Sequence, residues 1–331
     1  MQARASLLAA LLVLGVLSTV NAAPTVRTTV DIDPPFAIIH LTLGGAPARK
    51  LTFLMGNFSK YLDYAFAIGD NNVYSPGRLE GDVLHFNLSG SDVREAWIVL
   101  RAFRYEYSAI ISLPLPLVPL ELPPTNFSFV VRNLPSYPNV ISSPFNVSVG
   151  YNASLGYFIA GSTAVDAPST GNLTFSLPAT DIRPAIKSVA RTVIVESSRT
   201  TIIDNLTLMG LVNGGSNAIT LTYPANLSIE EVGGLLGPYP PTLYTVTRAP
   251  NATTVTVNLL APPRSSGDKS YLWIKLVAPT LARDGRYAIP LFPSIGHYVQ
   301  NLTVVVKARG ELGGLGQARK EDGFNVYELP N

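Results

Sequence analysis

The sequence predicts an all-β protein made of tandem antiparallel β-sandwich domains with at most one or two short helices. Its composition is rich in Val, Ile, Leu, Thr, Tyr, Phe and Pro and poor in Lys, Gln and Met, which favours strands joined by turns. Apolar and polar residues alternate in short runs, as in TVTVNLL from Thr254 and LTVVVKA from Leu302, which indicates strands with one buried face. An internal repeat divides these strands between two domains.

The chain begins with a predicted signal peptide, residues 1–22. Arg4 supplies the positive charge, residues 7–17 the apolar core, and Val20, Asn21 and Ala22 the small-residue cleavage site. The alternative is an uncleaved anchor, but the apolar run has only about a dozen residues and a bilayer-spanning helix needs about 20. The longest later apolar stretch, residues 110–120, is broken by prolines. We therefore expect an extracellular or cell-surface protein with no transmembrane segment.

The repeat is seen when the chain is compared with itself. Residues 27–43 (RTTVDIDPPFAIIHLTL) and 191–208 (RTVIVESSRTTIIDNLTL) superimpose with one single-residue gap, and each has the pattern of a β-hairpin. Two further pairs follow in the same order, Trp97 with Trp273 and Asn126 with Asn301. These matches predict two copies of one β-domain. The alternative is chance similarity among Val/Thr-rich strands.

The predicted boundaries follow from this repeat. The first domain covers residues 23–183, the second and shorter copy 184–308, and a flexible C-terminal tail with one candidate strand 309–331. Three runs of the first copy, which start at Phe145, Gly156 and Asn172, are read as extra strands absent from the second. Apolar residues at helical spacing predict one helix over residues 56–68.

Charge and cysteine content exclude several classes. The formal net charge is only +2, which gives no electrostatic argument for nucleic acid or for an anionic membrane as partner. The absence of Cys removes disulfides, thiolate metal sites and Cys nucleophiles together. An exported chain without Cys and with few Met and Gln is typical of an archaeal cell surface, in particular that of a thermophile.

Asn-x-Ser/Thr sequons are the strongest functional signal. About three would be expected by chance at this composition. The chain has ten, which predicts covalent N-glycans on its surface. The acceptors are Asn57, Asn87, Asn126, Asn146, Asn152, Asn172, Asn205, Asn226, Asn251 and Asn301.

Residues that could carry chemistry are few, and we predict no enzyme, no cofactor and no metal site. The histidines His40, His85 and His297 form no ligand-spaced pair, and the first two lie in strand-like runs. No G-x-S-x-G motif is present. Asp31 and Asp33 precede a proline and are interpreted as turn residues.

Three other groups of residues have simple structural interpretations. Asp70, Asn71 and Asn72 lack the spacing of a calcium loop and are expected to form a solvated loop. Trp97 and Trp273 lie in apolar runs and are expected in the two cores. Three tyrosines near prolines could instead form an exposed platform for sugars: Tyr137, Tyr239 and Tyr244.

The order of segments resembles the lumenal region of ribophorin I, a non-catalytic oligosaccharyltransferase subunit. That family opens its mature chain with an R-T-V-D-like hairpin and an apolar stretch, similar to residues 27–31 and 51–68 here. Its second domain opens with an R-V-x-V hairpin, similar to residues 191–208. The resemblance implies two tandem β-sandwich-like domains and a supporting role without catalysis. The family continues into a membrane span and a cytosolic tail, which have no counterpart in this sequence.

The sequence therefore predicts an exported, N-glycosylated, non-catalytic structural or interaction protein of the cell surface. Its partners would be other surface proteins or copies of itself, joined by strand addition through residues 25–33 or 324–329. The sequon-free stretches 184–204 and 259–299 are the predicted contact regions. A ribophorin I-like accessory module and an extracellular glycan-binding module are the alternatives.

Overall fold

The computed structural model describes residues 24–329 except 46–47, 102, 106–107, 123–124, 167–170, 198, 280–281, 284–285, 288–290, 292 and 294. The predicted signal peptide lies outside these residues. Most of the described chain is in strands, and nearly all of its regular secondary structure is β, as predicted. Helical structure among the described residues consists of short 3-10 turns: η1 (Gly56–Tyr61), η2 (Asp70–Asn72), η3 (Ala179–Asp181) and η4 (Pro241–Leu243). None of them has the length or the apolar character of a membrane-spanning helix.

The first large sheet has eight strands in the order β13-β14-β11-β1-β2-β8-β4-β5. Strands β1 and β11 are parallel, and the other neighbours are antiparallel. The strands are β1 (Thr25–Asp33), β2 (Phe36–Gly44), β4 (Leu62–Gly69), β5 (Tyr74–Pro76), β8 (Val93–Leu100), β11 (Thr125–Leu134), β13 (Val147–Asn152) and β14 (Gly156–Val165).

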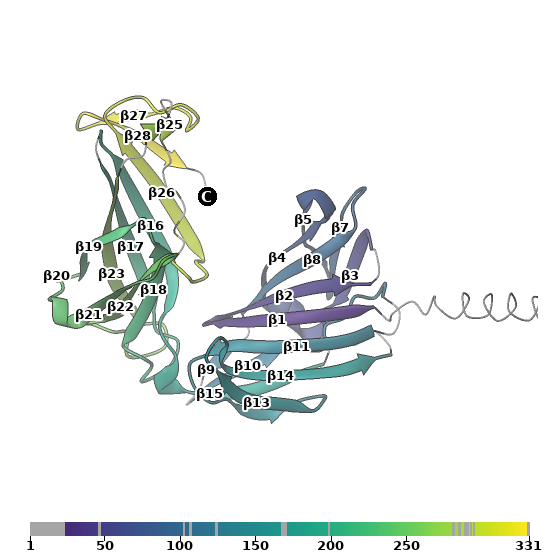
Figure 1. The fold of residues 1–331 in the computed structure, drawn as a ribbon. Helices are drawn as coiled ribbons and strands as arrows, with labels where there is room; N and C mark the ends of the chain where they lie inside the picture. The colour runs from purple at the N-terminus through teal and green to yellow at the C-terminus, as the bar shows by residue number, and fades with distance from the viewer. Residues whose placement is uncertain are drawn as a thin grey trace, which may run out of the picture.

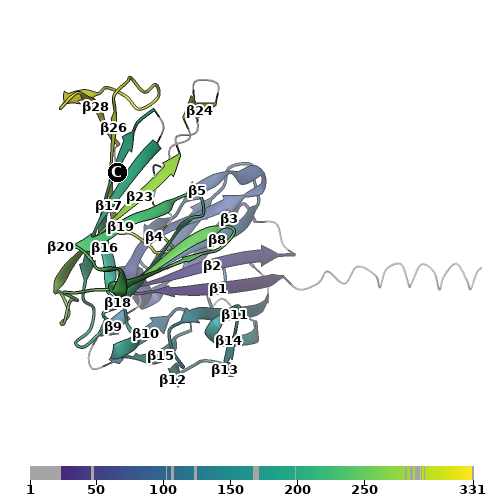
Figure 2. The ribbon, with the colours of Figure 1, turned by 60° about the vertical axis from the view of Figure 1, so that its left-hand side comes forward.

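The second large sheet, reversed, has the order β27-β28-β26-β16-β17-β23-β19-β20. Its parallel pair, β16 with β26, corresponds to β1 with β11, so each strand has a counterpart in the first sheet. Figure 1 shows the first copy in purple to teal and the second in teal to yellow, and Figure 2 shows them turned by 60°. The strands are β16 (Ala185–Val195), β17 (Arg199–Met209), β19 (Ser228–Gly234), β20 (Gly237–Pro238), β23 (Lys269–Pro279), β26 (Asn301–Ala308), β27 (Arg319–Glu321) and β28 (Phe324–Leu329).

Smaller sheets complete the layers. In the first copy they are β12-β15-β10-β9 and β3-β7-β6, and in the second β18-β22-β21 and the pair β24-β25. Their strands are β3 (Lys50–Leu54), β6 (Arg78–Glu80), β7 (Val83–Asn87), β9 (Phe103–Tyr105), β10 (Ser108–Leu113), β12 (Asn139–Ser142), β15 (Leu173–Pro178), β18 (Ala218–Pro224), β21 (Tyr244–Arg248), β22 (Ala252–Asn258), β24 (Ala282–Arg283) and β25 (Arg286–Tyr287).

Alternating side chains of the large and small sheets meet in two buried clusters, one in each copy. In the first, Ile39 of β2 and Ile98 of β8 belong to the same cluster as Phe53 and Phe86 of the small sheet. The same cluster also takes in Ala185 and Leu211, from beyond the predicted boundary at residue 183. The architecture is thus tandem β-sandwiches, with a layer of side chains between sheets in each copy.

Strand pairing fixes the register of the repeat more finely than the sequence could. His40 lies opposite Trp97 and Asn205 opposite Trp273, so the tryptophans are equivalent. Thr29 pairs with His40 and Ala190 with Asn205, at separations of 11 and 15 residues. Between these equivalent pairs, the second hairpin is therefore four residues longer than the first. The extra residues are divided between its two strands, so the predicted alignment with a single-residue gap was wrong.

The sequons Asn126 and Asn301 lie at the heads of equivalent strands but not at equivalent positions. Asn126 pairs with Thr25, four residues before Thr29, whereas Asn301 pairs with Ser188, two residues before Ala190. The shift of two residues leaves both side chains on the outer face of their sheets, since side chains alternate with period two.

The register also places an ion pair inside the sandwich of the second copy, at positions that are apolar in the first. Arg191 of β16 and Asp204 of β17 are paired, with exposures of 1% and 0%, and form two hydrogen bonds of 2.7 Å. The equivalent residues of the first copy are Val30 and Ile39, which are paired and fully buried. The same sandwich is thus built with either kind of pair.

Two predictions about individual elements were wrong. Residues 56–68 are not one helix: η1 ends at Tyr61 and β4 follows, because Ala65 and Ala67 pack inward while β4 pairs with β8. The strands β14 and β13 are not extra either, since β28 and β27 take their places in the second sheet. Val326 is buried there, so residues 319–329 belong to the sheet and are not a flexible tail.

The proposed donor strands are already in use. Strand β1 lies between β2 and β11, and β28 lies between β26 and β27. A strand with a neighbour on each side has little free backbone to offer to another chain. Strand addition through residues 25–33 or 324–329 is therefore not supported by this fold.

Candidate functional site

All ten sequon asparagines are exposed. Exposure is a requirement for glycosylation, and the fold meets it at every predicted acceptor. Asn133, Asn213, Asn217 and Asn258, which begin no sequon, are exposed as well. Surface position therefore permits modification of the predicted acceptors without distinguishing them from other asparagines.

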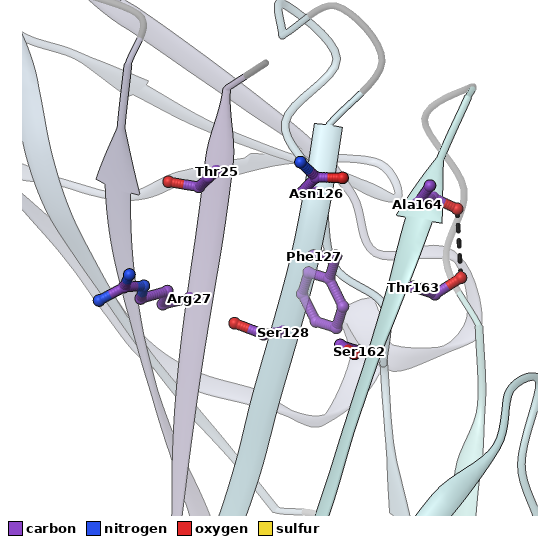
Figure 3. A pocket seen from close by; sticks show the side chains of 8 residues that line it. All are labelled: Thr25, Arg27, Asn126, Phe127, Ser128, Ser162, Thr163 and Ala164. Carbon is purple, nitrogen blue, oxygen red and sulfur yellow. Dashed lines mark hydrogen bonds between the residues drawn. The ribbon is translucent and has the colours of Figure 1, made fainter. Parts of the chain in front are cut away.

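Three acceptors lie on or beside strands at the β13 side of the first large sheet. Asn126 lies on β11, and Asn146 and Asn152 lie at the two ends of β13. Figure 3 shows Asn126 in a hollow of about 390 Å³ that is lined by side chains of β1, β11 and β14. Thr25, Arg27 and Ser128 contribute polar groups to its wall. A sugar attached to Asn126 would begin in this hollow.

The opposite side of the same sheet, toward β5, has an aromatic row, defined here as His40, Trp97, Phe66, Tyr74 and Tyr64. The His40 and Trp97 rings stack with centroids 4.0 Å apart, and Trp97 and Phe66 are nearly parallel at 6.0 Å. Phe66 stacks on Tyr74 at 5.3 Å and lies 5.8 Å from Tyr64. The row crosses β2, β8, β4 and β5, and none of the ten sequon asparagines lies on these strands.

Alternation within each strand explains the position of the row. On β4, Ala65 and Ala67 are buried, which leaves Tyr64 and Phe66 on the opposite face. Tyr64 and Tyr74 are 45% and 50% exposed, and their hydroxyl groups form a hydrogen bond. Burial and the contact with Tyr64 raise the pKa of Tyr74 to about 12.

A carboxylate adds a polar group to the other end of the row. His40 Nε2 lies 2.9 Å from Glu95 Oε2, and both side chains are partly exposed. Aromatic rings beside hydrogen-bonding groups are the composition of many recognition surfaces. The row is therefore a candidate surface for contact with a partner.

The equivalent face of the second copy is different. In the first copy, Trp97 is paired with His40 on one neighbouring strand and with Phe66 on the other. In the second copy, Trp273 is paired with the sequon acceptor Asn205 and with Gly233 at the equivalent positions. Its indole nitrogen donates to the Gly234 carbonyl oxygen at 3.2 Å. Both tryptophans lie on outer faces, so the prediction that they occupy the cores was wrong. Period-two alternation alone does not say which of two apolar faces is covered.

A second cluster lies where the two copies meet, and we call it the Asp33 joint. Asp33, at the end of β1, is 7% exposed and forms an ion pair with Arg183. It also accepts a hydrogen bond from the Tyr298 backbone N–H, and its Oδ1 lies 3.2 Å from His297 Nδ1. Arg183 precedes β16 and residues 297–298 precede β26, so these partners all belong to the second half of the chain.

Further contacts extend the Asp33 joint. The Tyr298 ring lies 4.5 Å from the Phe36 ring, and its hydroxyl donates to Asp63 Oδ2 at 2.7 Å. Arg101 Nη2 donates to Asp63 Oδ1 at 2.7 Å. Residues 297–298 fall in the sequon-free stretch 259–299, for which protein contact was predicted, and the contact they make is with the first copy of the same chain.

The protonation state of His297 affects this joint. Its Nε2 lies 2.5 Å from the Thr220 carbonyl oxygen, so both ring nitrogens face acceptors. Burial and the charge of Arg183 lower the pKa of His297 to about 4, which keeps the ring neutral in the folded protein near pH 7. A neutral ring has one N–H, so it can donate to only one of these two acceptors.

We expect the stability of the protein to fall as the pH decreases from about 6.5, the ordinary pKa of histidine, to about 4. In this window the unfolded chain binds the His297 proton and the folded chain does not, so protonation favours unfolding. Denaturant unfolding across the window would measure the effect. His297→Gln, which cannot be protonated there, should have a flatter profile, and an unchanged profile would contradict the assignment.

Other predicted residues have local roles. Asp31 accepts from Arg132 Nε at 2.7 Å and from Asn133, and Asp70 pairs with Arg94. The proposed tyrosine platform is not formed, because Tyr239 is buried in the second core and Tyr137, which is exposed, packs against Tyr157. His85 lies on β7. Among the described residues, no group of three His, Asp or Glu side chains could hold a metal ion.

Comparisons with known proteins give no family. No protein-family model matches the chain, and no curated protein matches it. Among solved structures, the chain is similar to the N-terminal domain of the Streptococcus gordonii adhesin Sgo0707 at 10% identity and a TM-score of 0.21. The match covers 74% of this chain and 52% of that one, so the chain spans about half the length of that structure. A likeness of this size carries no argument about function.

Proposed function

We propose that this chain is an exported, N-glycosylated, non-catalytic protein of the cell surface that contacts a partner protein through its aromatic row. The proposal rests on the contrast between the two copies. They share one strand order, yet the second has a sequon acceptor, Asn205, at the centre of the face on which the first has His40 and the row. A bulky glycan at Asn205 would prevent close protein contact there, whereas no sequon asparagine lies on the strands that carry the row.

Partners of the row would be other surface proteins or copies of this chain. Tyrosine and tryptophan are frequent anchors of protein interfaces because they bury a large apolar area and still form hydrogen bonds. The row presents its most exposed surface at Tyr64 and Tyr74. Removing both rings would remove the most accessible part of the interface.

Cross-linking and co-sedimentation with native envelopes test the proposal. We expect Tyr64→Ala/Tyr74→Ala to weaken association about tenfold or more, the effect of losing interface anchors. The matched control is Tyr137→Ala/Tyr151→Ala, which removes tyrosines that are 63% and 68% exposed elsewhere on the first copy. Glycopeptide mass spectrometry of the native protein checks export and sugar load in the same sample. Equal binding by both variants, or no association of the wild-type protein with native envelopes, would remove this function.

A ribophorin I-like accessory role is the second candidate. The observation that favours it is the tandem pair of sandwiches with one strand order, which is the architecture that the resemblance implies. Pull-down from gently solubilised membranes should then recover a glycosyltransferase subunit, and its repeated absence would argue against this role. A glycan array with Tyr64→Ala/Tyr74→Ala tests the third candidate, a glycan-binding module, in which the row would stack against sugars.

A further inference from the structure

The first large sheet ends in β13, and the described residues place no further strand along its outer edge. Strand β13 has six residues, and among the described residues its only strand partner is β14. An edge strand exposes unpaired backbone N–H and C=O groups, to which a strand of another molecule can bind. Natural proteins block such edges with charged side chains, proline, bulges, short strands or a covering segment.

The sequence around β13 supplies none of the usual charges. Residues 133–165 contain no Asp, Glu, Lys, Arg or His, and β13 itself contains no proline. Valine and tyrosine alternate along its other face at Val147, Val149 and Tyr151, and Tyr151 is 68% exposed. An uncharged edge with β-branched and aromatic residues favours association between molecules.

The other edges of the two large sheets are protected in these ways. Strand β5 has three residues and ends in Pro76, and β20 has two and ends in Pro238. Strand β27 consists of Arg319, Lys320 and Glu321. Each combines short length with proline or charge, and β13 has neither.

The smaller sheets are protected as well. On β3, Thr52 bonds with the loop at 120–121 through both its N–H and its carbonyl oxygen. On β18, the Thr222 N–H donates to the Ile295 carbonyl oxygen. Strands β6, β9 and β21 contain arginine, β12 has four residues between Pro138 and Pro144, and β24 and β25 have two residues each.

At β13, sequons are found where the other edge strands have proline, charge or short length. Asn146 directly precedes the strand and Asn152 ends it, and both are exposed. At about 3.3 Å per residue they lie about 20 Å apart, one at each end of the edge. We propose that N-glycans on Asn146 and Asn152 protect this edge from pairing with a second copy of the chain. The inference rests on the proposed function, because it requires export and glycosylation.

The test removes these two sequons without altering the asparagines. Ser148→Ala/Ser154→Ala abolishes both, and it keeps the hydrogen bond from the Ser154 backbone N–H to Asn152 Oδ1. We expect this variant to form concentration-dependent dimers or larger species by light scattering, with hydrogen exchange slowed at β13. The matched control, Thr207→Ala/Thr303→Ala, removes the sequons of Asn205 and Asn301 and should stay monomeric.

A charge variant separates edge protection from a general effect of sugars on solubility. Ser148→Lys/Ser154→Ala also lacks both sequons, but it places a lysine on the exposed outer face of β13. We expect it to remain monomeric, because a charge takes over the role of the sugar. Wild-type protein made in a host without N-glycosylation should associate through β13, which provides a second preparation with no substitution.

Several results would overturn the inference. A monomeric, folded Ser148→Ala/Ser154→Ala variant would do so, as would monomeric unglycosylated wild type, equal association of the Thr207→Ala/Thr303→Ala control, or association of the lysine variant. Glycopeptide mass spectrometry separates the two proposals. Sugars at other acceptors but none at Asn146 and Asn152 would refute edge protection alone, whereas no sugar on any asparagine would refute the proposed function too.

Discussion

Asp204→Ala is expected to lower the free energy of unfolding by about 3–5 kcal/mol, because it leaves the Arg191 guanidinium buried without its carboxylate. Arg191 is 1% exposed and forms two hydrogen bonds of 2.7 Å with Asp204. Tyr223 packs beside this pair, and burial and the Asp204 charge raise its pKa. Denaturant unfolding of the variant against wild type measures the loss.

Replacing the whole cluster by apolar residues should restore stability. We expect Arg191→Met/Asp204→Leu/Tyr223→Phe to be within about 1 kcal/mol of wild type or more stable, since a buried ion pair gains little over well-packed apolar residues. The first copy supplies the precedent, with Val30 and Ile39 buried at the equivalent positions. A triple variant less stable than Asp204→Ala would contradict this explanation.

Asp33→Asn is expected to cost about 2–5 kcal/mol, because one charge of a buried, hydrogen-bonded pair is removed. Arg183 would keep its charge in a site where burial already lowers its pKa to about 10. The matched control is Asp31→Asn, two residues earlier on β1, whose side chain and that of its partner Arg132 are 26% and 41% exposed. An exposed pair of this kind contributes about 0–1 kcal/mol.

The structural consequence of Asp33→Asn distinguishes the joint from a general loss of stability. The contacts of Asp33 with Arg183, His297 and Tyr298 connect the two halves of the chain. We expect Asp33→Asn to increase the radius of gyration in small-angle scattering and to speed proteolysis near η3, while Asp31→Asn changes neither. Equal behaviour of the two variants would show that Asp33 does not hold the copies together.

Several features could be predicted because their signals are local. Alternation along Thr254–Asn258 and along β26 marked strands, and the hairpin patterns revealed the repeat. Local signals failed at residues 62–68, where Leu62, Ala65 and Phe66 satisfy helical spacing but pairing with β8 makes a strand. Local signals failed again at Trp97. An apolar run predicts a strand, but it does not predict which face of the sheet is covered.

The candidate sites could not be predicted from local sequence patterns, because they depend on contacts between residues that are distant in the chain. The aromatic row joins residues from four strands, and Asp33 meets partners 150 to 265 positions further along the chain. Nothing near Asp33 in sequence distinguishes it from Asp31, which pairs at the surface. Which aspartate is buried follows from where the segment before β26, with His297 and Tyr298, meets the end of β1.

The sequence by itself determined the strand content, the twofold repeat and the positions of the ten sequons, because each is written in residue type and short-range spacing. Only the tertiary structure decided the register of the hairpins, the face on which each tryptophan lies, the joint at Asp33 and the identity of the free edge. These depend on pairing between distant strands, whose free energy comes from burial and hydrogen bonding summed over the whole sheet. Asn146 and Asn152 illustrate the division, since two motifs visible in the sequence acquire a role only once β13 is known to be an edge.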